Sequence, residues 1–128
     1  MTRFDRALIA KRGLKAARLH AVLTEIARRF SYPELDIDNI AVTLGLSRRY
    51  VQELLEPTGK SFTQHLAERR LECVYAMLND SRYRHSTIID IAYAAGFSDA
   101  SHFYRMFRGR FGRTPSDVRA AAFGSDQK

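Results

Sequence analysis

The sequence predicts an all-α fold, a seven-helix bundle of two helix-turn-helix subdomains joined by a long linker helix. Apolar residues recur at three- and four-residue steps through most of the 128 residues, which is the period of a helix. No run of alternating β-branched residues predicts a strand. One segment of the first half is repeated in the second, and the residues between the copies suit one long helix.

Helix ends are marked by capping side chains and by glycine or proline, since glycine accepts a left-handed cap and proline cannot continue a helix. The expected helices, in chain order, cover residues 14–30, a short segment ending at 44, then 48–55, 61–79, 88–95, 100–109 or a little beyond, and 116–122. The expected N-terminal caps are Asp36 or Asp38, Ser47, Thr87 and Asp99. The residues expected to end helices are Pro33, Gly45, Pro57, Gly59, Gly96 and Gly112.

These elements divide the chain into five parts. Residues 1–13 are expected to be a linker or a frayed N-terminus, and residues 123–128 a flexible tail. Between them we expect a first helix-turn-helix subdomain over 14–60, a linker helix over 61–80 and a second subdomain over 81–122.

The internal repeat is the most informative feature. Residues 40–47 read IAVTLGLS and residues 91–98 read IAYAAGFS. In each copy the small alanine lets two helices approach, the glycine makes the turn, and Leu46 or Phe97 fills the core beneath it. The following helix shows its polar side outward, a geometry that lets one helix enter a major groove of DNA. The alternative is two ordinary helical hairpins packed as a bundle, and the presence of a second copy favours the helix-turn-helix.

The charge balance is basic, with 21 Lys and Arg against 14 Asp and Glu and a net charge of +7. Seventeen of the basic residues are arginines, whose planar fork of donors suits phosphates and guanine edges. Such a domain attracts a polyanion through phosphate contacts. Charge alone does not decide the matter, because many basic proteins bind no nucleic acid.

The length of the linker helix is suited to placing two recognition helices on one DNA duplex. A helix of roughly 19 residues spans about 28 Å, and neighbouring major-groove segments on one face of DNA lie about 34 Å apart. One monomer could therefore read an asymmetric site in successive grooves. We expect this domain to be monomeric, and dimeric if it is part of a longer chain.

Four segments follow one known family pattern: LGLSRRYVQELL, TGKSF, RRLE and IIDIAYAAGFSDASHFYRMFRGRFGRTPSDVR. They resemble the DNA-binding domain of the AraC/XylS family of bacterial transcription regulators, over about residues 37–119. Two departures affect the first unit: the turn at 56–59 is one residue shorter than in many members, and Leu55 replaces a common phenylalanine. The resemblance implies a sequence-specific regulator, more often an activator, that binds double-stranded promoter DNA and contacts RNA polymerase.

Candidates for base contacts in the first unit are the exposed positions of its second helix. They are Arg48, Arg49, Gln52 and Glu53. Arginine can bind guanine with two hydrogen bonds, glutamine can bind adenine, and glutamate can accept from cytosine N4. By the resemblance, Arg49, Gln52 and Glu53 occupy base-facing positions. For Glu53, repulsion from phosphates or a pair with a neighbouring arginine is an equal alternative, and Tyr50 is expected to pack on the flank.

In the second unit the corresponding exposed set is Ala100, Ser101, His102 and Arg105. Arg105 is the strongest candidate for a base contact, with a phosphate contact as the alternative, and Ala100 could touch a thymine methyl group. The phosphate-contact candidates of both units, chosen on polarity and position, are Thr43, Lys60, Ser61, Tyr104, Arg108, Arg110 and Arg113.

Several classes lack support in the sequence. No stretch of about 18 apolar residues predicts a membrane span, and the N-terminus lacks the apolar core of a signal peptide. The single cysteine, Cys73, is expected to be a buried packing residue and fits a reducing cytoplasm. His102 has no Cys or second His at ligand spacing, so no metal is expected. Without a phosphate loop, paired carboxylates or a Ser-His-Asp order, neither an enzyme nor a cofactor is expected.

Two other functional classes remain open alongside sequence-specific regulation. One is a non-specific architectural DNA-binding protein that uses charge alone. The other is a helical protein–protein adaptor whose arginines only keep it soluble. The length also fits either a stand-alone regulator or the C-terminal part of a longer one.

Overall fold

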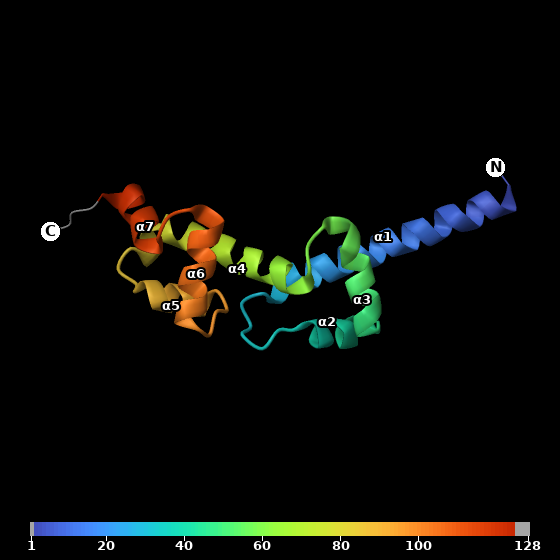
Figure 1. The fold of residues 1–128 in the computed structure, drawn as a ribbon, viewed down its shortest axis with the longest axis horizontal. Helices are drawn as coiled ribbons and strands as arrows, with labels where there is room; N and C mark the ends of the chain where they lie inside the picture. Colours follow the sequence, from blue (N-terminus) through green and yellow to red (C-terminus); the bar gives the residue numbers. More distant parts are fainter. Residues whose placement is uncertain (1, 125–128) are drawn as a thin grey trace. The chain divides into compact units, whose positions relative to one another are not determined.

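The computed structural model describes residues 2–124, which form seven α-helices and two short 3₁₀ segments without a strand (Figure 1). The helices are α1 (Arg3–Arg29), α2 (Ile37–Leu44), α3 (Arg48–Leu55), α4 (Phe62–Leu78), α5 (Ile88–Ala94), α6 (Ala100–Phe111) and α7 (Pro115–Phe123). The segments η1 (Glu56–Thr58) and η2 (Ser81–Tyr83) follow α3 and α4. The predicted all-α class is thus confirmed. None of the described helices is long and apolar enough to span a bilayer.

The chain folds as two compact units. Unit 1 holds residues 2–29 and 35–65, and unit 2 holds residues 30–34 and 66–124. Each copy of the internal repeat therefore lies in a unit of its own. The helix α4 begins in unit 1 and ends in unit 2.

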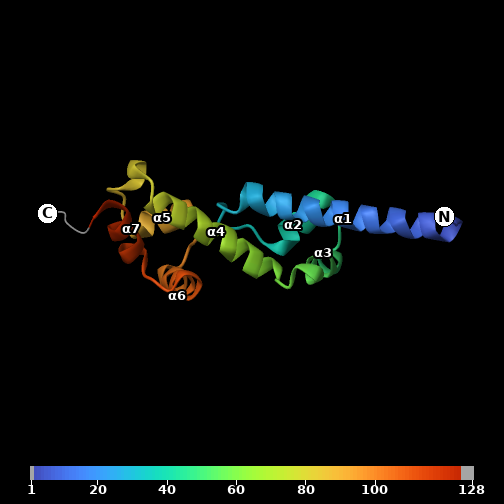
Figure 2. The same cartoon turned by 90° about the horizontal axis from the view of Figure 1, so that it is seen from above.

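Unit 1 is built on the C-terminal half of α1, against which α2 and α3 pack (Figure 2). The fully buried side chains of this core are Val22, Ile26, Ile40, Val51, Leu54 and Leu55. Ala41 is buried, as expected for the close approach of two helices, and Gly45 ends α2 in the left-handed conformation. Leu46 was expected to fill the core but is only half-buried, because the turn lies at the rim of the unit between exposed neighbours.

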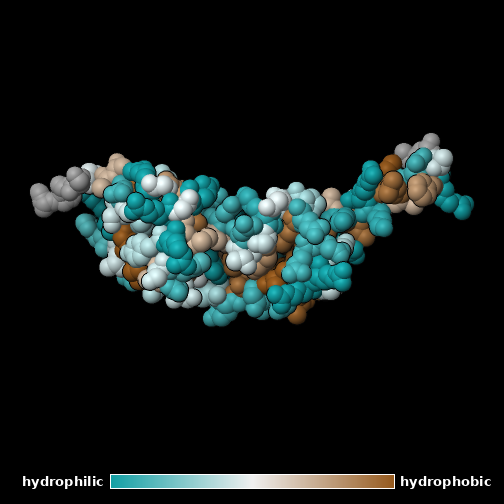
Figure 3. Space-filling model, viewed as in Figure 1, coloured by the Kyte–Doolittle hydropathy of each residue, from teal (hydrophilic) through white to brown (hydrophobic). Residues whose placement is uncertain are grey.

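The first helix starts earlier than the sequence predicts. Residues 3–13, expected to be a linker or a frayed terminus, are helical. The Asp5 N–H donates to the Thr2 hydroxyl at 3.0 Å, and the Thr2 N–H donates to the Asp5 carboxylate at 3.3 Å. This reciprocal cap satisfies donors at the helix start. The added turns are exposed, and they carry apolar side chains such as Phe4 among basic ones (Figure 3).

The last helix also runs slightly beyond its expected end. Phe123, assigned to the flexible tail by the sequence, is the final residue of α7, and residues 125–128 of that tail lie outside the described residues. The polar loop expected over 81–86 begins with the single 3₁₀ turn η2, which Asp80 caps through the Arg82 N–H.

Asp36, and not Asp38, caps α2. The Asp36 carboxylate accepts the Asn39 N–H at 2.8 Å, and the Asn39 side chain accepts the Asp36 N–H at 3.0 Å. We expect Asp36→Ala to lower the free energy of unfolding by about 1 kcal/mol, the usual effect of losing such a cap. Asp38→Ala is the matched control, because it removes the same charge two residues away and only a weak exposed ion pair. Urea unfolding followed by circular dichroism compares the two, and equal losses would contradict the assignment.

The core of unit 2 lies between the C-terminal part of α4 and the helices α5, α6 and α7. Its buried members are Leu71, Val74, Leu78, Ile91, Ala92, Ala95, Phe97, Phe103, Phe107 and Val118. The Phe103 ring contacts Phe97 and Phe107, with ring centroids 5.1 and 5.8 Å apart. Phe97 thus fills the core beneath the turn, as the repeat predicts. Cys73 is half-buried, less than expected, because it lies at the edge of this core beside Met77.

The segment 30–34 is held onto unit 2 by Arg70. The Arg70 guanidinium donates to the Phe30 carbonyl at 2.7 Å and to the Tyr32 carbonyl at 2.9 Å. Gly96, which ends the α5 turn at a φ of +111°, lies directly against this contact. Gly96 therefore packs closely against the Phe30 carbonyl and the Arg70 side chain. The sequence alone does not predict this contact.

Candidate nucleic-acid interface

The outer face of α3 carries the polar side chains of unit 1. Ser47 caps the helix by accepting the Tyr50 N–H at 3.0 Å, so the helix begins at Arg48. Val51, Leu54 and Leu55 are buried, and the helical period turns the remaining positions outward. The exposed side chains on this face are Arg48, Arg49, Gln52 and Glu53. The sequence predicts the same four positions.

These side chains are largely open to a ligand. The Arg48 guanidinium lies 3.5 Å from the Asp38 carboxylate, and each side chain is 60% exposed. Such a pair contributes about 0–1 kcal/mol, so a phosphate or a base can replace it. Within residues 2–124, the side chains of Arg49, Gln52 and Glu53 form no hydrogen bond or ion pair. The pairing of Glu53 with a neighbouring arginine, one of its two alternatives, is not formed there.

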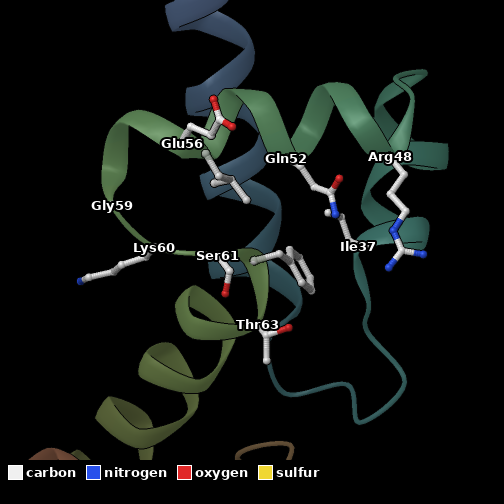
Figure 4. A pocket seen from close by; sticks show the side chains of 10 residues that line it. Ile37, Arg48, Gln52, Glu56, Gly59, Lys60, Ser61 and Thr63 are labelled. Atoms are coloured by element: carbon white, nitrogen blue, oxygen red, sulfur yellow. The ribbon is translucent and has the colours of Figure 1, made fainter.

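A hollow of about 520 Å³ brings two groups of candidates together (Figure 4). Arg48 and Gln52 reach its wall from α3, whereas Lys60 and Ser61 line it where α4 begins. The Ser61 hydroxyl accepts a backbone N–H of the first turn of α4 at 3.1 Å, which leaves its own proton to donate. Candidates for base and phosphate contacts thus border one concave surface of unit 1.

Arg18 of α1 is a residue of this region that the sequence analysis missed. Its guanidinium donates to the Tyr50 hydroxyl at 3.2 Å and lies 5.5 Å from the centre of the same ring. Tyr50 is half-buried on the flank of α3, as expected, and Arg18 ties it to α1. No local sequence pattern predicts this pair, because 32 positions separate the two residues.

We expect Arg18→Ala to lower the free energy of unfolding by about 1 kcal/mol, because it removes one hydrogen bond and one cation–π contact. Arg12→Ala is the matched control: it removes the same charge from an exposed turn of α1 where no partner is formed among the described residues. A double-mutant cycle with Tyr50→Phe, read by urea unfolding, isolates the hydroxyl contact. A coupling energy of zero would show that this hydrogen bond adds nothing.

Thr43, a phosphate-contact candidate, is partly engaged within unit 1. Its hydroxyl accepts from the Arg29 guanidinium at 3.1 Å. Arg29 also lies 3.4 Å from the Glu25 carboxylate, which Arg28 approaches to 2.9 Å. The buried Glu25 is therefore compensated by two arginines. The Thr43 hydroxyl keeps its proton and one lone pair for a ligand.

The helix of unit 2 that corresponds to α3 in the repeat is α6. Asp99 caps it by accepting the His102 N–H at 3.1 Å, and the fully buried Phe103 and Phe107 fix its inner face. The side chains of Ser101, His102 and Arg105 are exposed as predicted, whereas Ala100 is half-buried and not fully exposed. Ala100 is the first residue of the helix, and in a helix each Cβ tilts toward the N-terminal end.

Arg105 is held by its neighbour on α6. Its guanidinium lies 3.3 Å from His102 Nδ1. Arginine can only donate, so Nδ1 acts as the acceptor and the ring proton of a neutral His102 is on Nε2. This contact limits the freedom of Arg105, which lowers the entropy lost when it binds a ligand. His102 Nε2–H remains available as a second donor.

The remaining phosphate candidates of unit 2 lie on the outer side of α6 and the turn after it. Tyr104, Arg108, Arg110 and Arg113 are all exposed. The Arg110 guanidinium lies 5.1 Å above the ring of Phe111, and Arg113 donates to the Asp117 carbonyl at 3.2 Å. The Arg108 side chain forms no hydrogen bond or ion pair with the described part of the chain.

Neither a thiol nucleophile nor a metal centre takes shape in the described residues. Burial raises the pKa of the Cys73 thiol, which keeps it protonated. Across residues 2–124 no three His, Cys, Asp or Glu side chains gather as a group that could hold a metal ion.

Two helix-turn-helix units in one chain, each with a buried inner face and an outer face rich in arginine, define a class of DNA-binding domain. A family model described as a helix-turn-helix domain matches residues 40–121. The chain belongs to this family, the AraC/XylS family of DNA-binding transcription regulators.

Curated relatives and a solved structure agree with this assignment. The transcriptional activator RhaS of Escherichia coli (strain SE11) is 33% identical over 110 residues, which are 85% of this chain and 38% of that protein. The activator RhrA of Rhizobium meliloti (strain 1021) is 28% identical over 105 residues, 82% of this chain and 33% of that protein. An AraC-type transcriptional regulator from Chromobacterium violaceum superposes with a TM-score of 0.72 at 27% identity, covering 91% of this chain and 99% of the other. The chain thus spans less than two fifths of the length of these curated relatives.

Proposed function

We propose that this chain binds double-stranded promoter DNA in a sequence-specific way and regulates transcription, as an activator. The observation that carries the proposal is the repeated reading helix: α3 and α6 each bury their apolar face in a core and leave arginine, glutamine or histidine exposed. Arginine and glutamine are the side chains that read guanine and adenine in the major groove. The names of RhaS and RhrA as activators support the direction of regulation.

The roles of single residues follow from this proposal. Arg49 and Gln52 of α3 and Arg105 of α6 would contact bases, and Glu53 would accept from a cytosine. Lys60, Ser61 and Arg108 would contact phosphates and fix the register of each unit on the duplex. The activator would act in the cytoplasm and contact RNA polymerase at the promoter. No catalytic step is needed for any of these roles.

We further propose that one chain reads two segments of major groove. The 17 residues of α4 correspond to about 26 Å of helix, the same order as one turn of DNA. One copy of the chain would then recognise an asymmetric site.

Selection of bound sequences from a random duplex pool tests the proposal. We expect an enriched motif with two parts whose centres lie about 10 base pairs apart. One enriched part would mean that a single unit reads bases. Binding with a steep salt dependence and no enriched motif would replace the proposal with an architectural role. Absence of binding at low salt would favour a protein–protein adaptor.

A further inference from the structure

A second hollow, of about 460 Å³, lies in unit 2 away from the base-contact candidates of α6. Its wall includes Arg84 and His85, which follow η2, and Ser116, Arg119 and Phe123 of α7. None of the described residues that line it is acidic, and none belongs to α6. Among its described lining residues, the hollow therefore combines two guanidinium groups, an imidazole and a hydroxyl, and no carboxylate.

Both guanidinium groups are held in place before any ligand arrives. The Arg84 guanidinium lies 5.4 Å from the centre of the Phe123 ring. Arg119 is partly buried and donates through Nη1 to the Ser86 carbonyl. Restrained arginines lose less conformational freedom on binding than free ones, so the donors of the hollow are pre-organised for an anion.

Two carboxylates that lie near these residues in the chain, Asp80 and Asp117, have partners elsewhere in the described part of unit 2. Asp80 forms an ion pair with Arg82 at 2.7 Å. Asp117 takes part in the cap of α7 and lies 3.4 Å from the Thr114 N–H. Ser116 is the second residue of α7, where backbone N–H groups lack helical partners and carry partial positive charge. The described residues that line the hollow therefore contribute only positive charge and partial positive charge to it.

We propose that this hollow binds a phosphate group. Arginine forks, a serine hydroxyl and the first turn of a helix are the donors that bind phosphate in proteins. The ring of Phe123 adds an apolar wall for the body that carries the phosphate. Two sources share this chemistry: the backbone of duplex DNA, or a free phosphorylated small molecule. Only the first source depends on the proposed function.

Charge-matched variants of the full chain test the site. Arg84→Gln removes a charge that lines the hollow, and Arg12→Gln removes the same charge from an exposed turn of α1 that does not line it. Circular dichroism verifies that both variants fold. The probes are inorganic pyrophosphate, followed by NMR shifts of the Ser116 amide and the Arg119 side chain, and duplex DNA at several salt concentrations.

If a free ligand fills the hollow, pyrophosphate shifts these signals saturably in the native chain and in Arg12→Gln, and binds at least tenfold more weakly to Arg84→Gln. If duplex DNA fills it, Arg84→Gln reduces the slope of log K against log salt by about 1, as for the loss of one phosphate contact, while Arg12→Gln leaves the slope unchanged. The same behaviour of both variants in both assays would overturn the proposal. The selection from random duplexes could fail without affecting the pyrophosphate result.

Discussion

Gly96→Ala is expected to destabilise unit 2 severely. The new Cβ would lie 2.5 Å from the Phe30 carbonyl oxygen and 2.7 Å from Arg70 Nε, and these two atoms are hydrogen-bonded to each other. The φ of +111° is strained for any residue with a Cβ, at a cost of about 1–3 kcal/mol. Crowding against a backbone carbonyl adds about 1–3 kcal/mol. The sum is a large share of the roughly 5–15 kcal/mol that stabilise a typical domain.

Gly45→Ala is the matched control in the other copy of the repeat. Gly45 also has a positive φ, of +68°, but a Cβ there would meet no atom within 4 Å. Its cost is the left-handed backbone alone, about 1–2 kcal/mol. Urea unfolding by circular dichroism measures both losses. Hydrogen exchange locates them, with amides of α5 and α6 losing protection in Gly96→Ala and those of α2 and α3 keeping it. Equal losses from the two variants would show that the close approach to Phe30 does not matter.

Much of the fold could be predicted because helix ends are set by local chemistry. Ser47, Thr87 and Asp99 cap helices as expected, since a short polar side chain before an apolar stripe satisfies a backbone N–H three residues on. The start of α1 was missed although Thr2 and Asp5 have capping spacing. The prediction relied on the apolar stripe, which begins only at residue 14. The earlier turns of α1 pack against no core in the described part of the chain, so they carry no such stripe.

The exposed side chains of the site could be predicted where the apolar pattern of a helix sets its outer face. They could not be predicted where contacts between distant residues place a side chain. The apolar positions of α3 and α6 determine which side faces outward, so seven of the eight base-contact candidates are exposed as the sequence predicts, and Ala100 is half-buried. Arg48 also pairs weakly with Asp38. The Arg18–Tyr50 pair and the Arg84–Phe123 contact join residues far apart in the sequence. No local pattern encodes such pairs, and they became visible only in the folded chain.

Removing the arginine that we propose contacts bases from each of α3 and α6 is expected to have the largest effect on DNA binding. Arg49→Ala and Arg105→Ala should each weaken binding to the selected duplex by about 1–3 kcal/mol, roughly 5- to 150-fold in Kd. Each should also relax base preference in one half of the motif only. A fluorescence-anisotropy titration with substituted duplexes measures both effects. Arg12→Ala, an exposed arginine outside both helices, is the control and should leave base preference unchanged.

The double variant Arg49→Ala/Arg105→Ala tests whether both helices contact bases or only one does. Arg49 and Arg105 lie in different units and share no contact, so their effects should add. The expected total of about 2–6 kcal/mol would bring specific binding close to non-specific affinity. If the Arg105→Ala loss were the same on every sequence and the salt slope fell by about 1, the residue would contact phosphate instead of a base. Base reading would then rest on α3 and on the remaining donors of α6, chiefly His102, and His102→Ala would have to show the relaxed preference that Arg105→Ala did not.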